Sequence, residues 1–258
     1  MKKIFYGFLT LVMFLFTACT TSEPVEETVQ VQNYSVTTET VTENVKDESG
    51  KEVFTVEFTY PIVTSQKENT AVKELNEKFK KEALDFVAKT RSGDLAENAK
   101  DNAKIAKQKN IEFYPHSSTI KYVIEYSNDN IVSFLKATEE YVGGTDHIYK
   151  SEGETYNLDN CKKLELSEVF EATNIGLNEI LEKGFNEEAK NNPNLYTGKT
   201  SFTSNDFSDN IKDLKWYLGG DGIVFFFNPD TIIPENKDIL QFTYPYTGNK
   251  TMFKVPIN

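Results

Sequence analysis

Residues 119–138, TIKYVIEYSNDNIVSFLKAT, are the stretch that decides the fold. Two runs rich in β-branched and aromatic residues, 119–126 and 131–138, flank the turn Asn128-Asp129-Asn130. Asn and Asp tolerate the left-handed backbone conformation that tight turns need, so this stretch predicts a β-hairpin. We therefore expect an antiparallel sheet at the centre of the chain.

Helix and strand patterns continue on both sides of this hairpin. Residues 54–60 alternate apolar and polar side chains, which predicts a half-buried strand. Apolar residues recur at helical spacing over 72–87 and 174–190, whereas the stripe over 94–109 is thin and rich in alanine. A C-terminal hairpin is expected over 214–227, with the glycines at 219, 220 and 222 supplying positive φ angles.

Strands grouped around separate helices predict an α+β fold. We expect two adjacent half-domains, each an antiparallel sheet packed with one or two helices. Their expected bounds are residues 34–139 for the N-terminal half and 140–258 for the C-terminal half.

The N-terminus resembles an export signal. Lys2 and Lys3 precede a short apolar run, and the small residues Thr17 and Ala18 lead into Cys19. A basic start, a short apolar segment and a small-residue cleavage site are typical of a secretory signal and too short for a spanning helix. The four residues 16–19, FTAC, resemble a bacterial lipobox, which implies a signal peptide over 1–18 and lipid attachment at Cys19. An ordinary secretory signal with a chance cysteine is the alternative.

A polar, acidic segment follows the cysteine. Residues 19–33 contain few large apolar side chains, so we predict a disordered tether. Its flexible residues would span roughly 20 Å. The expected location is therefore extracytoplasmic, with the folded part held by lipid at the cell membrane or outer membrane.

The charge balance excludes one class of partner. The full chain carries a net charge of −12, and removal of Lys2 and Lys3 leaves 26 basic against 40 acidic side chains. Nucleic-acid binding depends on Lys and Arg neutralising phosphates, so no nucleic-acid partner is expected. A cationic partner would be steered toward this surface, although solubility alone also explains an acidic surface.

Residues able to support catalysis are few. The chain contains two histidines, His116 and His147, and no metal-binding motif, so neither a metal nor a cofactor is expected. Asp146 and His147 are neighbours, but neighbouring side chains on a strand point to opposite faces. After lipidation of Cys19, Cys161 would be the one remaining thiol. It is either reactive or, as we favour, a small buried apolar residue.

A family resemblance begins at residues 140–147, EYVGGTDH. With 130–135 (NIVSFL), 161–170 (CKKLELSEVF) and 222–234 (GIVFFFNPDTIIP), these residues resemble a domain pair of unknown function. That pair occurs in the outer part of RsiV-type anti-sigma factors and ahead of the catalytic domain in PdaC-type peptidoglycan deacetylases. The resemblance covers about residues 34–256. The sequence departs from the family pattern by an Asp inserted before His147 and by Asp230-Thr231 in place of Tyr-Glu.

The resemblance implies a binding module without a catalytic domain. In RsiV-type sensors this region binds lysozyme, a basic protein, which an acidic surface would suit. The candidate binding residues are Tyr141, Gly143, Gly144, His147, Trp216 and Asp230.

Three functions remain open. The first is a lipid-anchored, non-enzymatic envelope module that binds a basic wall-associated protein such as lysozyme, or wall glycan (peptidoglycan). The second is a cell-wall hydrolase or deacetylase that uses His147 with nearby carboxylates. The third is a structural envelope lipoprotein.

Overall fold

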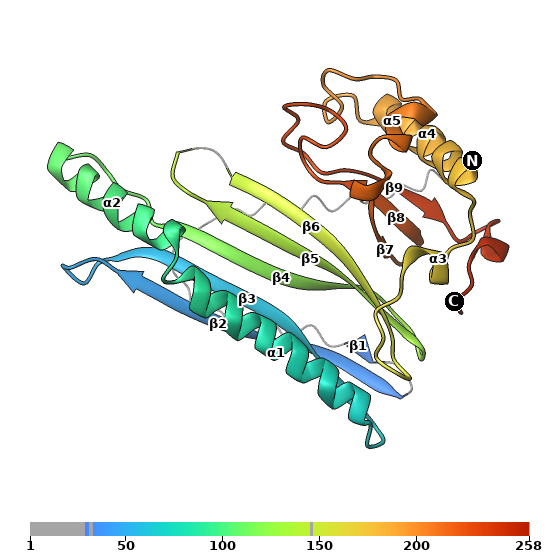
Figure 1. Cartoon of the computed structure of the whole chain (residues 1–258), viewed down its shortest axis with the longest axis horizontal. Coiled ribbons are helices and arrows are strands. Elements are labelled where there is room, and N and C mark those ends of the chain that lie inside the picture. The colour runs from blue at the N-terminus through green and yellow to red at the C-terminus, as the bar shows by residue number, and fades with distance from the viewer. Residues whose placement is uncertain (1–28, 31–32, 145–146, 258) are drawn as a thin grey trace, which may run out of the picture.

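The computed structural model describes residues 29–30, 33–144 and 147–257 (Figure 1). The predicted signal segment 1–18, the attachment residue Cys19 and most of the predicted tether lie outside the described residues. The elements in chain order are β1 Val29–Gln30, β2 Tyr34–Lys46, β3 Glu52–Ser65, α1 Thr70–Thr90, α2 Asp94–Lys109, β4 His116–Ser127, β5 Ile131–Tyr141, β6 His147–Asn157, α3 Leu166–Val169, α4 Asn174–Asn191, α5 Ser204–Ser208, η1 Ile211–Asp213, β7 Lys215–Leu218, β8 Gly222–Phe227, β9 Leu240–Pro245 and η2 Lys250–Met252. The predicted α+β class is confirmed.

A six-stranded sheet in the order β1-β2-β3-β4-β5-β6 forms the larger part of the molecule. The expected hairpin is present as β4 and β5, which pair antiparallel. The expectation of a fully antiparallel sheet was wrong at one place, because β3 and β4 run parallel. The two helices between these strands carry the chain back along the sheet, as a parallel pair requires.

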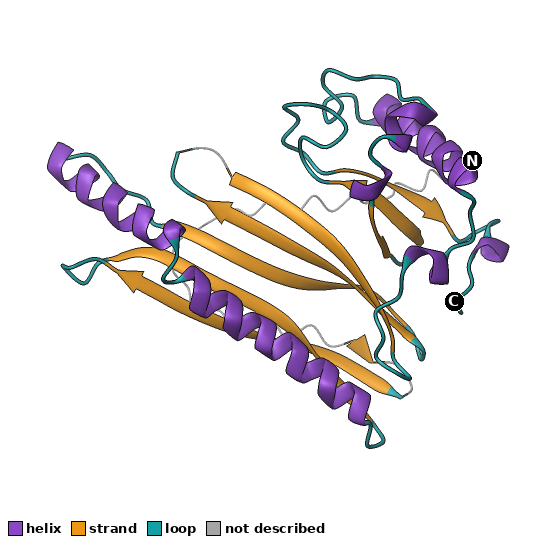
Figure 2. Cartoon of the chain, viewed as in Figure 1, coloured by secondary structure: helices purple, strands orange, loops and turns teal. Residues whose placement is uncertain are grey.

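Helices α1 and α2 cover one face of this sheet (Figures 1 and 2). Asn69 caps α1 by accepting hydrogen bonds from the N–H groups of Ala71 and Val72. The buried stripe of α1, namely Val72, Leu75, Phe79, Ala83 and Val87, lies within the predicted apolar face. The small residues of α2 bring that helix close to the sheet, since Ala96 and Ala99 are fully buried. None of the helices in the described part combines the length and apolar character needed to cross a bilayer.

The second unit is a three-stranded sheet, β7-β8-β9, with α4 and α5 packed against it. It rests on the opposite face of the larger sheet, at β5 and β6. A side chain at Gly153 of β6 would begin 1.6 Å from the carbonyl oxygen of Trp216, so only glycine permits this contact. Ser133 Oγ also accepts a hydrogen bond from the N–H of Leu218 at 2.9 Å.

Two expected boundaries differ from the structure. The division between residues 139 and 140 falls inside β5, and β6 pairs with β5 along its whole length, so the first sheet continues to Asn157. Within the predicted tether, Val29 and Gln30 form β1 and pair with Val36 and Ser35. An unpaired strand edge is a template for another strand, which accounts for this pairing.

The glycines of the C-terminal hairpin have a different role from the one expected. Gly219, Gly220 and Gly222 are not among the described residues with positive φ. A Cβ atom at Gly222 would lie 2.1 Å from the carbonyl oxygen of Tyr244. This glycine is therefore required by the close approach of β9.

Candidate functional site

Four of the six predicted site residues lie together at one end of the large sheet. Tyr141 ends β5, Gly143 and Gly144 form the turn, and His147 begins β6 directly opposite Tyr141. Gly143 and Gly144 have φ angles of +97° and +82°, which only glycine adopts without strain. The Gly-Gly pair is thus a turn, and it fixes the register that sets Tyr141 beside His147.

Three aromatic rings form a row on the surface at this end. The ring centroids of Tyr141 and His147 are 4.8 Å apart, and those of His147 and Tyr149 are 5.9 Å apart with nearly parallel planes. Glu139 binds two members of the row: its Oε1 lies 2.6 Å from Nδ1 of His147 and accepts a hydrogen bond from the Tyr149 hydroxyl at 3.4 Å. The carboxylate therefore orients the rings before any partner binds.

His116 lies beneath the same turn. It is 3% exposed, its Nδ1 has no hydrogen-bond partner, and a Cβ at Gly143 would lie 3.1 Å from its Nε2. The rings of Phe113 and Tyr141 contact it, with centroids at 5.5 and 6.3 Å. Burial lowers the pKa of His116 below its ordinary value of 6.5, which favours the neutral ring at pH 7.

A pocket of about 310 Å³ opens beside His116, between the end of α2, the segment 111–114 and the β5–β6 turn. Apolar side chains surround it although they are exposed: Ile111 is 60% exposed and Tyr114 58%. Ten large apolar side chains are exposed in the described residues, and six of them lie at this end: Ile105, Ile111, Tyr114, Val142, Ile148 and Tyr149. We call these six, together with Tyr141 and His147, the hairpin-end surface.

Several residues of this surface were not predicted from the sequence. Ile105, Ile111 and Tyr114 come from α2 and the segment after it, far from the Gly-Gly turn in the chain. Asn110 ends α2 in the left-handed conformation, with φ of 52°, and directs the apolar residues 111–114 toward the turn. The one available signal was that the large apolar residues Ile111, Phe113 and Tyr114 follow directly after Asn110, a residue that often ends helices.

Trp216 and Asp230 belong to the second unit. Trp216 lies in β7 and packs against the core of that unit. Asp230 follows β8, has a φ angle of +60°, and accepts a hydrogen bond from Nζ of Lys237 at 3.1 Å. No hydrogen bond, ion pair or ring contact in the described residues links either one to the hairpin-end surface.

Cys161 is half-buried against the first core, and burial raises the pKa of its thiol. The favoured interpretation, a small buried apolar residue, stays a prediction. In the described part of the chain, no three His, Cys, Asp or Glu side chains gather as they would around a metal ion.

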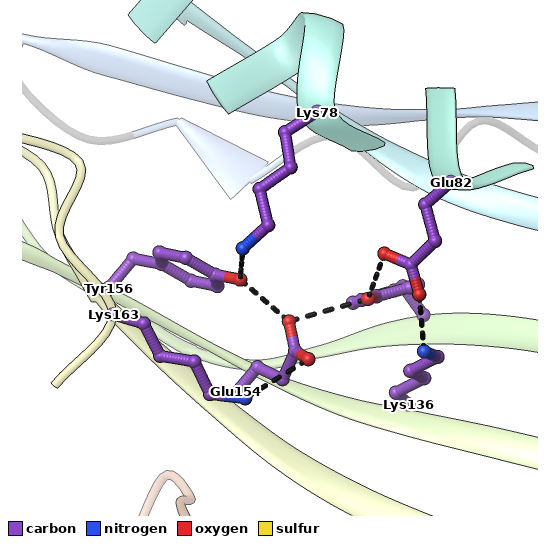
Figure 3. Close-up of polar contacts among 7 residues, drawn as sticks. Lys78, Glu82, Lys136, Glu154, Tyr156 and Lys163 are labelled. Atoms are coloured by element: carbon purple, nitrogen blue, oxygen red, sulfur yellow. Dashed lines mark hydrogen bonds and ion pairs between the residues drawn. The ribbon is translucent and has the colours of Figure 1, made fainter. Parts of the chain in front are cut away.

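A second group of polar residues lies between the sheet and helix α1 (Figure 3). The buried carboxylate of Glu154 accepts hydrogen bonds from the hydroxyls of Tyr156 at 2.7 Å and Tyr122 at 3.3 Å, and from Nζ of Lys163 at 3.1 Å. The remaining members are Lys78, Glu82 and Lys136. We call these seven residues the buried polar cluster.

Each acidic group of this cluster has a basic partner. Lys136 binds Glu82, Lys163 binds Glu154, and Lys78 donates to the Tyr156 hydroxyl at 3.3 Å. Burial alone would raise the pKa of Glu154, but the Tyr156 hydrogen bond and the Lys163 charge outweigh it and lower this pKa. A fully partnered cluster of this kind serves the stability of the sheet, so we place the candidate site at the hairpin-end surface.

Comparisons with known proteins agree with the resemblance in the sequence. Residues 47–147 match the family model described as "Deacetylase PdaC". The structure is similar to a solved member of the DUF3298 family from Bacteroides fragilis, with 19% identity, a TM-score of 0.58, and coverage of 87% of this chain and 95% of that one. A DUF3298 family protein from Pseudomonas aeruginosa is also similar, with 12% identity, a TM-score of 0.47, and coverage of 84% and 94%. No curated protein matches the sequence.

The family model covers part of the chain, and the solved structure, at 19% identity, shows the fold. Residues 47–147 thus match the PdaC-type model, the fold over most of the chain is that of a solved DUF3298 family protein, and the family resemblance predicted from the sequence is confirmed.

Proposed function

We propose that the protein is a lipid-anchored, non-enzymatic binding module of the bacterial cell envelope, and that its hairpin-end surface docks a basic wall-associated protein. The observation that carries this proposal is the gathering of six of the ten exposed large apolar side chains at one end of the sheet. Exposed apolar side chains that gather in one region of a soluble protein mark sites of interaction. Ile105, Ile111, Tyr114 and Val142 line one pocket, whereas Ile148 and Tyr149 are neighbours on β6 and point to opposite faces of the sheet. Tyrosines are also enriched where binding energy concentrates.

The position of this surface suits a partner beyond the membrane. β1, which lies within the predicted tether, pairs with the first residues of β2, whereas the hairpin-end surface lies at the other end of the sheet (Figure 1). The 13 residues of β2 span about 40 Å at roughly 3.3 Å per residue. An anchor at Cys19 therefore joins the folded part at the end remote from the surface.

Charge supports a basic partner over a neutral one. Glu112 accepts a hydrogen bond from the Tyr114 hydroxyl at 2.7 Å, and Glu139 contacts His147, whereas Lys107 and Lys109 lie in the last turn of α2 close by. A basic partner is therefore favoured by the charge of the chain as a whole, which is −12. A net negative charge accelerates association with a cationic protein and makes it sensitive to salt.

A binding experiment with lysozyme tests the proposal. The full chain is immobilised, and binding of lysozyme is measured across a salt series for wild type and for the double variant Ile111→Ser/Tyr149→Ser. We expect at least tenfold weaker binding for this variant and weaker wild-type binding at high salt. Ile175→Ser is the matched control, because Ile175 is 74% exposed but lies in the second unit.

Unchanged binding by the double variant, or binding insensitive to salt, would contradict a basic protein docked at this surface. Binding of soluble peptidoglycan fragments alone would replace the protein partner with wall glycan. If neither lysozyme nor peptidoglycan fragments bind, the remaining function is that of a structural envelope lipoprotein. Mass spectrometry of membrane fractions tests the anchor, since the proposal requires lipid on the sulfur of Cys19.

One observation favours a second function. The 2.6 Å separation between Nδ1 of His147 and Oε1 of Glu139 is that of a histidine oriented by a carboxylate, which a general base requires. A cell-wall hydrolase using this pair would cleave peptidoglycan, and a deacetylase would remove its acetyl groups. Either activity should be lost in His147→Ala. Activity that persists in this variant, or no activity in wild type, excludes this function.

A further inference from the structure

The outer edge of β2 is open over most of its length. β1 covers only Ser35 and Val36, and in the described residues no strand lies beside β2 from Thr37 to Lys46. Thr40, Thr42 and Asn44 are exposed along this edge. An open strand edge presents unpaired backbone N–H and C=O groups to which another strand can be added.

The register shows which backbone groups face outward. Gln66 N–H donates to the carbonyl of Asn33 at 3.0 Å, so odd-numbered residues of β2 bond to β3. Pro61 has no N–H and lies opposite Thr38, at a pair that needs no such bond. By the same alternation the N–H and C=O groups of Thr38, Thr40, Thr42 and Asn44 point away from the sheet, since the register stays regular up to Val45.

Charge distinguishes among three possible occupants of this edge. Glu39 and Glu43 are exposed on β2, and Glu57 of β3 accepts a hydrogen bond from Thr42 on the adjoining strand. A second copy paired antiparallel about Val41 would set Glu39 opposite Glu43. Continuation of the β1 register toward the N-terminus would set Glu26 opposite Glu39. Like charges directly opposite each other destabilise a strand pair, so this register of a second copy and this continuation of the N-terminal segment are disfavoured. A second copy paired about Thr40 or Thr42 avoids the contact, but it brings no basic side chain opposite Glu39 or Glu43.

We infer that the β2 edge from Thr38 to Asn44 is a strand-addition site for an extended basic segment of a partner protein. Backbone hydrogen bonds to the four outward-facing residues would supply the binding, as in other cases of strand addition. Lysine or arginine side chains on one face of the added strand would lie beside Glu39 and Glu43, whereas Glu57 lies on the other face with Thr42. This inference does not depend on the hairpin-end surface, which lies at the β5–β6 turn.

The test uses a labelled nine-residue peptide that alternates Lys and Thr, with a Glu–Thr peptide as its matched control. Binding to the full chain is followed by fluorescence anisotropy, and amide hydrogen exchange by NMR. We expect the Lys–Thr peptide to bind and to slow exchange at the outward-facing amides of Thr38, Thr40 and Thr42. The Glu–Thr peptide should not bind.

Thr40→Pro removes an outward donor while leaving the β2–β3 ladder intact, and should weaken peptide binding at least tenfold. Thr40→Val keeps the backbone and should bind as wild type does. If Thr40→Pro does not fold, the exchange pattern of the wild-type protein decides alone. No binding of the Lys–Thr peptide, or protection elsewhere than at alternate β2 residues, would overturn the inference. A wild-type dimer that Thr40→Pro converts to monomer would overturn it in favour of a second copy.

Discussion

The buried polar cluster and the hairpin-end surface lie at the same sheet, but they differ in hydrogen bonding. The polar groups of the cluster all have partners, whereas not all of those at the hairpin end do. In the cluster, Glu154 is surrounded by three donors and its charge is balanced by Lys163. At the hairpin end, apolar side chains are exposed and the buried His116 keeps an Nδ1 without a partner. A region whose groups are all satisfied contributes to stability, whereas one with unmet groups and exposed apolar surface is suited to a partner.

The largest expected effect is a loss of unfolding free energy when the cluster is altered, and a much smaller loss when the hairpin end is altered. Glu154→Ala removes a buried carboxylate that accepts three hydrogen bonds, whereas Tyr122 keeps its bond to Glu82 and Tyr156 its bond to Lys78. Because Lys163 is 42% exposed and can be hydrated, the expected loss of unfolding free energy comes from the hydrogen bonds and should exceed that for a single bond to a charged group, about 1.5–3 kcal/mol. Urea denaturation followed by circular dichroism measures it. Glu139→Ala at the hairpin end is the control, and it should change stability by about 0.5 kcal/mol at most. Similar losses in both variants would contradict the distinction.

Smaller losses of unfolding free energy are expected when single hydrogen bonds of the cluster are removed, and their sizes show which bond matters more. Tyr156→Phe removes the 2.7 Å hydrogen bond to Glu154 and should cost about 1.5–3 kcal/mol, the range for bonds to charged groups. Tyr122→Phe removes contacts of 3.3 Å and should cost less. The same denaturation experiment compares the two variants. A larger loss for Tyr122→Phe would show that the carboxylate depends chiefly on Tyr122.

Acidification should affect the two regions in succession. The pKa of His116 is lowered by burial, so the unfolded chain binds its proton first and stability falls as the pH drops below about 6.5. The pKa of Glu154 is lowered in the folded state, so its contribution is present above about 4.5 and is lost below that value.

Each group changes the slope by at most about 1.4 kcal/mol per pH unit. Unfolding free energies measured between pH 7 and pH 3 test the order. His116→Gln should flatten the curve just below pH 6.5, and Glu154→Gln should flatten it only below pH 4.5. An unchanged slope near pH 6 in His116→Gln would show that this histidine is not held neutral by the fold.

The smallest expected effect on stability comes from the surface itself. Ile111→Ser/Tyr149→Ser alters side chains that are 60% and 44% exposed, so the free energy of unfolding should change by about 0.5 kcal/mol or less. Equilibrium denaturation measures this directly. A loss of several kcal/mol would mean that these side chains support the fold, and weaker lysozyme binding in that variant would then carry no information about docking.

Local sequence patterns predicted individual elements well. The apolar spacing of residues 72–87 predicted the buried face of α1, and the run 119–138 predicted the β4–β5 hairpin, because both patterns arise between near neighbours in the chain. The parallel pairing of β3 and β4 was missed because strand direction depends on the path of the two helices between them. Local periodicity does not record that path.

The candidate site was predicted in part. Residues 140–147 pointed to Tyr141, the glycine turn and His147, and the register of one hairpin is enough to bring these together. Trp216 and Asp230 were grouped with them although they lie in the second unit. Ile111 and Tyr114 join the surface only because of where α2 ends, and His116 lies beneath it only because β3 and β4 pair in parallel.

The sequence by itself determined which segments form helices and strands and where the glycine turn falls, because backbone preference and short-range periodicity act within a few residues. The tertiary structure decided that Glu154 is buried beside its donors, that His116 lies beneath the turn, and that no strand of the described residues covers β2 beyond Val36. These features depend on contacts between segments tens of residues apart. Such contacts are fixed by the packing of the whole chain and by no local pattern.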